Sequence, residues 1–433
     1  MHIGVARGLA AALQAGLAVT AFACCRQLGV RRSLAAAGAA ASIAIAQPFW
    51  PIASPHWLAS LLVQLLLLAL LAMQQRPWQR RWLARGAIIG ALAATQQQKA
   101  VPFAVLGAVV IAFDAATSAP AGRRWRAAAG AAGAFALGVL AVLGPVMGIA
   151  VAQAGFGPVF DGLVRFPLVQ YHRANQAPWG WTSSPTGSSR VRIVRALPWV
   201  LTLLGATALR GAARRDWRGI RATVVLLATG IAAAASILYN PDVVHLAFIA
   251  GIFVIALADC LERGLQFAAR GRPGLRRLAP WLAAAGLLWS GYELERVAAW
   301  ARGNATARIE TAFGTVAANT YHIHNLAYPL VQAMVDRDPD RRLLVYPWMS
   351  SLYLMTGGRN PTPYQCMQAG YLSAAQVERA IAAVDAARVR TIVVSEWNSK
   401  PDPALARYLA DHYRPVLGPL GFPSSTVYER VAP

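Results

Sequence analysis

Lys99 is the first residue of this chain whose type and setting point to chemistry. It is one of two lysines in the sequence, and it follows three glutamines, Gln96–Gln98, at a break between two apolar runs. An ionisable group at membrane depth is costly and usually faces a cavity. A lysine at such a break can hold a phosphate as a point charge. The alternative is a lysine that only extends its charge to the membrane surface.

The segment 154–195 contains a second set of side chains that could bind or react. It mixes aromatic residues with five arginines, one carboxylate and one imidazole. Asp161 is the candidate catalytic carboxylate, and Arg165, His172 and Arg173 are candidates for binding a substrate. Guanidinium groups form paired hydrogen bonds with phosphate oxygens, so a phosphate-bearing ligand would explain these arginines. Contacts with anionic lipid headgroups would explain them equally well.

A short polar turn at 241–245 provides a third set. Asp242 and His245 are three residues apart at a predicted helix start, so they share one face of that helix. We expect Asn240 to cap the helix, and His245 is a candidate substrate ligand. His56 is predicted to be a turn residue at the membrane interface.

Arginine clusters and apolar runs alternate along the chain and must position these side chains. Twenty arginines fall into five clusters, and each cluster separates two long apolar runs. The clusters are Arg26/Arg31/Arg32, Arg76/Arg80/Arg81/Arg85, Arg123/Arg124/Arg126, Arg210/Arg214/Arg215/Arg218/Arg221 and Arg263/Arg270/Arg272/Arg276/Arg277. Loops that hold arginine close to membrane segments stay in the cytoplasm. The pattern predicts a polytopic membrane protein whose orientation follows from its charges.

The apolar runs predict about ten transmembrane helices, because a spanning helix needs about 20 residues. The runs are 4–24, 33–50, 57–74, 100–117, 127–152, 196–210, 221–238, 243–260 and 279–298, with the shorter run 86–95 as the tenth. With ten crossings every arginine cluster faces the cytoplasm. The turns at 47–56, 96–99, 154–195 and 239–245 then share the outer face. Asp114, Asp216, Asp259 and Glu262 are expected to be loop or helix-end groups on the cytoplasmic side.

The sequence changes character after residue 299. Ten of the eighteen carboxylates lie in the tail 300–433. Strands are predicted at 342–348, 389–395 and 426–431, and helices at 373–388 and 401–413. This alternation predicts a small α/β domain with a partly parallel sheet. We therefore expect two domains, a multi-span membrane domain at 1–299 and an extracytoplasmic α/β domain at 300–433.

Composition excludes several classes of protein. The chain is 57% hydrophobic and 14% charged, so its net charge of +23 reflects membrane topology and not nucleic-acid binding. The four cysteines show no disulfide or metal-binding spacing. Phosphate-loop, metalloprotease and serine-hydrolase motifs are absent from the sequence. We expect no cofactor, and nothing in the sequence indicates a divalent metal.

The layout resembles the GT-C membrane glycosyltransferases, and more narrowly the bacterial branch related to ArnT and the protein O-mannosyltransferases. The resemblance rests on the Gln-Lys break Thr95–Lys99, the turn Pro241–His245, the many-helix membrane half and the α/β tail. The tail segment Leu352–Thr362 is also similar to a segment that these bacterial proteins carry after their last helix.

The resemblance implies a hexosyltransferase in the bacterial cytoplasmic (inner) membrane, with a role in the cell envelope. It would move a sugar from a polyprenyl-phosphate donor to a lipid, glycan or protein acceptor on the outer face. Lys99 matches the position that holds the donor phosphate, and His245 matches the histidine of the outer turn. The family's catalytic carboxylate lies in its first outer loop. We expect this chain to lack that loop and the preceding helix, so it would be inactive as it stands unless Asp161 substitutes.

Two other classes of protein stay open. A polysaccharide polymerase or ligase also uses long outer loops rich in arginine and histidine, but it usually lacks a folded α/β tail. A transporter or an envelope assembly protein could use the tail to bind a partner. Transporters tend to have inverted repeats and charged groups at mid-membrane, and neither is visible in this sequence.

Overall fold

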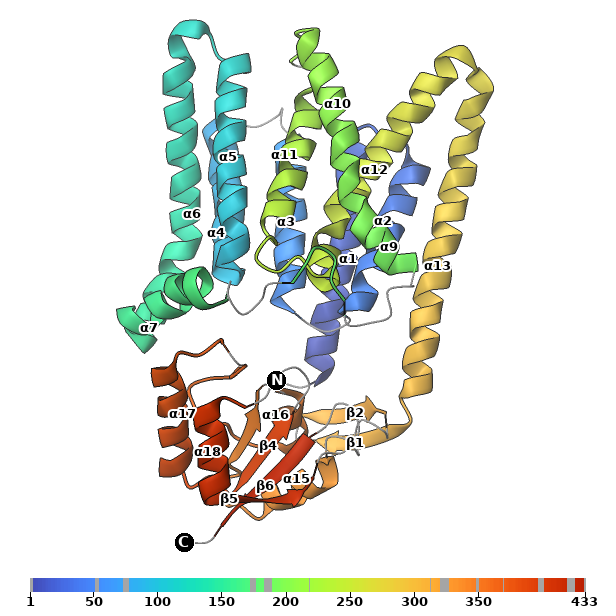
Figure 1. Ribbon diagram of the computed structural model, residues 1–433. Coiled ribbons are helices and arrows are strands. Elements are labelled where there is room, and N and C mark those ends of the chain that lie inside the picture. The colour runs from blue at the N-terminus through green and yellow to red at the C-terminus, as the bar shows by residue number, and fades with distance from the viewer. Residues whose placement is uncertain are drawn as a thin grey trace. The chain divides into compact units, whose positions relative to one another are not determined.

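The computed structural model describes residues 3–50, 54–72, 78–171, 177–182, 189–217, 219–311, 313–319, 327–347, 350–368, 370–395, 401–418 and 425–431 (Figure 1). These residues divide into two compact units. The helical unit comprises 7–164 and 175–297. The tail unit comprises 298–433 together with two short segments, 1–6 and 165–174.

Helices make up the first unit almost entirely. They are α1 (Ile3–Gln27), α2 (Arg32–Ala46), α3 (Pro55–Leu71), α4 (Trp78–Thr95), α5 (Gln97–Ser118), α6 (Arg124–Ala154), α7 (Phe156–Phe160), the π-helix η3 (Asp161–Tyr171), α9 (Ser189–Ala196), α10 (Val200–Ala213), α11 (Arg221–Ala235), α12 (Val243–Gly271) and α13 (Leu278–Asn304). Short 3-10 turns are η1 (Gln47–Phe49), η2 (Ala121–Arg123), η4 (Leu197–Trp199) and η5 (Pro273–Arg277). The first residues of α1 and the last residues of α13 and η3 belong to the tail unit.

Five helical segments of the described chain are long and apolar enough to cross a membrane. They are Gly4–Gln27, Gln97–Thr117, Arg124–Ala154, Ser189–Ala213 and Val243–Gly271. Large apolar side chains on their outer faces are exposed, such as Val101, Val105 and Val109 along one side of α5. Exposed apolar faces of this extent suit contact with lipid. The fourth segment begins at Ser189, seven residues before the predicted start of that run.

Helix α12 is the centre of the helical unit and is buried along most of its length. It packs against α2, α3, α10 and α11 (Figure 1). Its apolar side chains therefore join the others in one continuous core. A helix that is apolar on all sides is the one that a bundle can surround completely.

Buried carboxylates pair with arginines of the predicted clusters. Asp114 on α5 binds Arg221 on α11, with Nε–Oδ1 at 2.8 Å, and Glu262 on α12 binds Arg31, with Nε–Oε2 at 2.7 Å. Asp216 lies between α10 and α11, as expected of a loop group, but the same expectation for Asp114, Asp259 and Glu262 is wrong. All three lie within helices and are at most 5% exposed. A buried carboxylate needs a charged or hydrogen-bonding partner, and helix-end arginines provide it.

Glycines bring α4 and α6 into direct backbone contact. A Cβ atom on Gly138 of α6 would lie 2.1 Å from the carbonyl oxygen of Leu83, and one on Gly86 of α4 would lie 2.0 Å from that of Phe135. Gly86 and Gly90 are four residues apart, a spacing that lets two membrane helices approach closely. The short run 86–95 is therefore the part of α4 that packs against α6.

The tail unit contains a four-stranded mixed sheet and a separate hairpin. The sheet has the order β3 (Leu343–Tyr346), β4 (Thr391–Ser395), β6 (Ser425–Arg430), β5 (Tyr413–Leu417). Strands β3 and β4 are parallel, and the other pairs are antiparallel. The hairpin pairs β1 (Ala307–Thr311) with β2 (Gly314–Ala318). The prediction of a small α/β domain with a partly parallel sheet is confirmed.

Helices cover both faces of this sheet. Side chains of α17 (Ala374–Ala386) and α18 (Pro403–His412) form a core with one face. Side chains of α15 (Tyr328–Asp336) and α16 (Ser350–Thr356) form a core with the other face. Burial on both faces explains why β3 and β4 are continuous apolar runs. The sequence predicted α17, α18, β3, β4 and β6 but missed β5, whose first residue, Tyr413, it placed at the end of a helix.

The contact between α4 and α6 predicts a position-specific loss of stability. Gly138→Val places a side chain against the backbone of α4, and overpacking of this kind costs about 1–3 kcal/mol. We expect the midpoint of thermal unfolding, measured on the chain in detergent, to fall. Gly144→Val is the matched control on the same helix, because nothing lies within 4 Å of a Cβ at Gly144. Equal midpoints for the two variants would contradict the packing.

Candidate functional site

Lys99 lies in the first turn of α5 and is buried, with 2% of its surface exposed. The helix begins here because Gln96 is extended and starts the helical hydrogen bonds by accepting from the amides of Lys99 and Ala100. A cation at the amino end of a helix meets the positive end of the helix dipole, which disfavours it. Burial of an ammonium adds a further desolvation cost. Neither effect stabilises the fold, so Lys99 needs another explanation.

His56 is the hydrogen-bond partner that the described residues provide for the Lys99 side chain. Lys99 Nζ lies 3.2 Å from His56 Nδ1, and an ammonium can only donate, so the imidazole nitrogen accepts. The His56 ring stacks on Phe248 of α12, with ring centres 4.4 Å apart. Lys99 Nζ also lies 5.2 Å from the centre of the Phe248 ring. This arrangement assigns the other nitrogen of His56, Nε2, as a donor.

His56 was predicted to be a turn residue, and this prediction is wrong. It lies in the first turn of α3, where Ser54 caps the helix by accepting a hydrogen bond from the His56 amide. The sequence did predict that the turn ending at His56 shares one face with the break at Lys99. What it could not show is that the two side chains point at each other.

His245 and Asp242 form a bonded pair at the start of α12. Asp242 Oδ1 accepts from both the backbone amide and Nδ1 of His245, each at 2.8 Å. Asp242 is thus the cap of this helix, which corrects the expected cap at Asn240. A cap residue accepts a hydrogen bond from the amide of the second or third helical residue, and here the Asp242 carboxylate accepts from the amide of His245. Donation from Nδ1 leaves Nε2 of a neutral His245 as an acceptor.

Three helix amino termini meet at these side chains. His56, Lys99 and His245 each lie in the first turn of α3, α5 and α12 respectively. The rings of His56 and His245 meet edge to face, with centres 5.4 Å apart. Amino termini attract anions through their unpaired amides and their dipoles. We call His56, Lys99, Asp242, His245 and Phe248 the lysine cluster. Its single carboxylate, Asp242, bonds to His245, so the positive potential of the cluster comes from Lys99 and the three helix amino termini.

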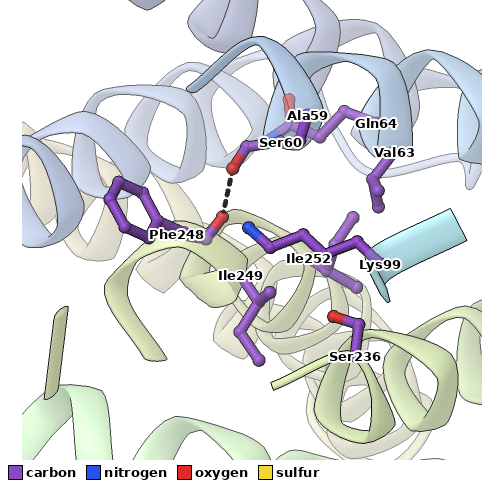
Figure 2. A pocket seen from close by; sticks show the side chains of 9 residues that line it. All are labelled: Ala59, Ser60, Val63, Gln64, Lys99, Ser236, Phe248, Ile249 and Ile252. Atoms are coloured by element: carbon purple, nitrogen blue, oxygen red, sulfur yellow. Dashed lines mark hydrogen bonds between the residues drawn. The ribbon is translucent and has the colours of Figure 1, made fainter. Parts of the chain in front are cut away.

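A small cavity lies beneath Lys99. Figure 2 shows the Lys99 side chain extending from α5 toward Ser60 and Phe248. Ser60 Oγ bonds to the carbonyl oxygen of Phe248, which ties α3 to α12. The cavity measures about 10 Å³, the lower limit for one water molecule. Gln64, which also lines it, has a buried Oε1 without a hydrogen-bond partner in the described chain. This cavity is therefore too small to hold a phosphate.

A segment of the long predicted loop covers the start of α12. The amide of Gly180 donates to the carbonyl oxygen of Pro241 at 2.6 Å, and the amide of Val243 donates to that of Trp181 at 2.9 Å. Arg195 Nε in turn donates to the carbonyl oxygen of Gly180 at 2.7 Å. Residues 177–182 are thus held at the edge of the lysine cluster.

The other predicted site residues are more scattered. Asp161 is exposed at the start of η3, and the carboxylate of the lysine cluster is instead Asp242. Arg165 belongs to the tail unit. His172 and Arg173 lie outside the described residues. Much of the segment 154–195 was predicted to be a loop, but 156–171 and 189–195 are helical.

Two arginines of that segment are explained by the protein itself. Arg190 Nε lies 3.2 Å from Oε2 of the buried Glu293 on α13. Arg195 binds the Gly180 carbonyl described above. Neither arginine therefore requires a phosphate or a lipid headgroup to account for it. The phosphate interpretation of this segment is left to Arg165, Arg173 and the exposed Arg192.

No protein-family model matches this sequence, and no curated protein matches it. No group of three or more histidine, cysteine, aspartate or glutamate side chains with the geometry of a metal site occurs in the part of the chain that the structure describes.

The setting of Lys99 predicts that its charge does not stabilise the fold. Lys99→Met keeps the length and apolar stem of the side chain and removes a buried cation from a helix amino terminus. We expect the midpoint of thermal unfolding in detergent to stay the same or rise. Asp114→Asn is the contrasting control, because removing one partner of a buried pair costs up to about 3–5 kcal/mol. A fall for Lys99→Met as large as that for Asp114→Asn would assign Lys99 a structural role.

Proposed function

We propose that this chain is a multi-pass protein of the bacterial inner membrane with its lysine cluster at the outer face. Helices α3 and α12 both start at the lysine cluster, so their carboxyl ends lie together at the other end of the bundle. There Arg31 binds Glu262 of α12, and Arg85 donates to the carbonyl oxygen of Ala69 at 2.9 Å. Arginine at that end favours the cytoplasm, which leaves the lysine cluster outside.

The same argument supports ten crossings. Besides the five long segments, α2, α3, α4, α11 and α13 also run between the two ends of the bundle. Helix α13 begins after the arginines of η5, and about four turns later its Glu293 binds Arg190 of α9. Arg195, one turn beyond Arg190, reaches the segment beside the lysine cluster. The chain therefore enters its tail from the lysine-cluster end, which favours an extracytoplasmic α/β domain.

The function that the site supports best is binding of a lipid-linked phosphate for sugar transfer. One observation carries this proposal: a buried lysine at the meeting point of three helix amino termini. A lysine, a histidine Nε2 donor and three sets of helix-end amides suit a phosphate. The resemblance to GT-C enzymes indicates the reaction, which is transfer of a sugar from a polyprenyl-phosphate donor with polyprenyl phosphate as the leaving group.

In this reaction the acceptor hydroxyl attacks the anomeric carbon of the donor sugar. The bond from that carbon to the phosphate oxygen breaks, and its electron pair leaves with the polyprenyl phosphate. Lys99 and His56 stabilise the charge that develops on the leaving oxygen. The hydroxyl proton passes to Nε2 of His245, which Asp242 holds in the accepting tautomer. Asp242–His245 is thus the base that the described site offers in place of a loop carboxylate.

Binding of the leaving group tests this proposal without knowledge of the sugar. Lys99→Met should weaken binding of a long-chain polyprenyl phosphate to the full chain by about 10–100-fold, since a hydrogen bond to a charged group contributes about 1.5–3 kcal/mol. The dissociation constant can be measured by native mass spectrometry in detergent. The unphosphorylated polyprenol should bind weakly and equally to both proteins.

His245→Gln is the matched control within the same cluster. Because His245 is assigned to the acceptor and not to the phosphate, this variant should bind polyprenyl phosphate as the unmodified chain does. Equal binding by the unmodified chain and Lys99→Met would refute the phosphate site. Equal loss in the two variants would refute the division of roles.

A further inference from the structure

A second polar cavity opens at the opposite end of α12. Its volume is about 380 Å³, within the range of small-molecule sites, and it is lined by Arg31, Glu262, Gln266, Arg270 and Arg276. Gln266 and Arg270 lie one turn apart on α12. Arg276 comes from the following turn η5, and Arg31 from the loop before α2.

The charge of this cavity is positive. Its one carboxylate, Glu262, is already bound on both oxygens, by Arg31 Nε and Nη2 and by Gln266 Nε2, at 2.7 to 2.9 Å. Arg270 and Arg276 have exposed side chains. The amino end of the 15-residue helix α2 lies here as well, and the backbone amide of Arg31 at this end donates to Glu262 Oε2 at 3.2 Å. Glu262 thus neutralises Arg31 and this helix end, and the two further guanidinium groups, those of Arg270 and Arg276, favour an anion.

The cavity is far from the lysine cluster. Phe248 of the lysine cluster and Gln266 of the cavity are 18 residues apart on one continuous helix, or about 27 Å at 1.5 Å per residue. One bound phosphate cannot contact both. The two sites therefore need separate ligands. The inference drawn here takes from the proposal above only that this end of the bundle faces the cytoplasm.

Apolar side chains on α12 and α13, close in sequence to the residues that line the cavity, indicate what the anion is attached to. Leu261 and Phe267 on α12 are exposed by 43% and 66%, and Trp281 near the start of α13 by 75%. Exposed aromatic side chains beside arginines are typical of the headgroup level of a membrane. Basic pockets between helix ends on the cytoplasmic side hold anionic headgroups. A soluble phosphate has no apolar part that could contact these side chains, whereas a phospholipid does.

We infer that this cavity, hereafter the arginine pocket, binds the phosphate of an anionic phospholipid. Arg270 and Arg276 bind the phosphate oxygens. The Arg31–Glu262 pair forms the inner wall of the pocket, and the acyl chains lie along the exposed apolar side chains. A lipid in this pocket would join the α1–α2 loop, α12 and η5. It would therefore secure the end of the bundle that faces away from the lysine cluster.

The test compares lipids on the delipidated full chain in detergent. Native mass spectrometry measures binding of phosphatidylglycerol, zwitterionic phosphatidylethanolamine and inorganic phosphate. We expect phosphatidylglycerol to bind at least about tenfold more tightly than either of the others. The double variant Arg270→Gln/Arg276→Gln should lose this preference by a similar factor. Both positions are exposed, so the fold should survive; the single variants provide the measurement if the double variant does not fold.

The matched control is Arg210→Gln/Arg214→Gln, which removes two exposed arginines from the end of α10. It should bind phosphatidylglycerol as the unmodified chain does. Equal losses in the two double variants would show a general charge effect and overturn the arginine pocket. Inorganic phosphate that binds as tightly as the lipid would overturn the assignment to a phospholipid.

Discussion

The structure of the lysine cluster depends on a buried ammonium placed where the protein's own dipoles oppose it. Lys99 lies in the first turn of α5, and its side-chain nitrogen contacts the imidazole of His56 and the ring of Phe248. The starts of α3 and α12 add positive potential to the same place. A protein tolerates such a concentration of positive potential where an anion is to be bound.

The two ends of the helical bundle are built differently. At the arginine-rich end, each buried carboxylate named here is bound by a guanidinium group, as in the pairs Asp114–Arg221 and Glu262–Arg31. These pairs tie helices that are distant in sequence. At the other end, Lys99 is left without a carboxylate, because Asp242 bonds to His245. The buried carboxylates Asp114 and Glu262 are thus neutralised by arginines, whereas the buried Lys99 has no carboxylate partner among the described residues.

Periodicity and charge predicted the general organisation of this chain but not its contacts. The apolar runs gave the helices, and the β-branched runs gave strands β3 and β4, because burial on both faces leaves a continuous apolar pattern. The sequence identified Lys99 as a candidate because it is one of only two lysines, and His245 because it ends the polar turn Pro241–His245. His56 was missed, since its role depends on a contact 43 residues along the chain, with Lys99. The burial of Asp114 and Glu262 was missed for the same reason: the sequence does not show which helix ends meet.

An experimental structure of the full chain in lipid nanodiscs with a bound polyprenyl phosphate tests the central claim most directly. The account predicts that the phosphate lies within hydrogen-bond distance of Lys99 Nζ and faces the first turns of α3, α5 and α12. A phosphate bound elsewhere, with the Lys99–His56 contact intact and no density near it, would contradict the account.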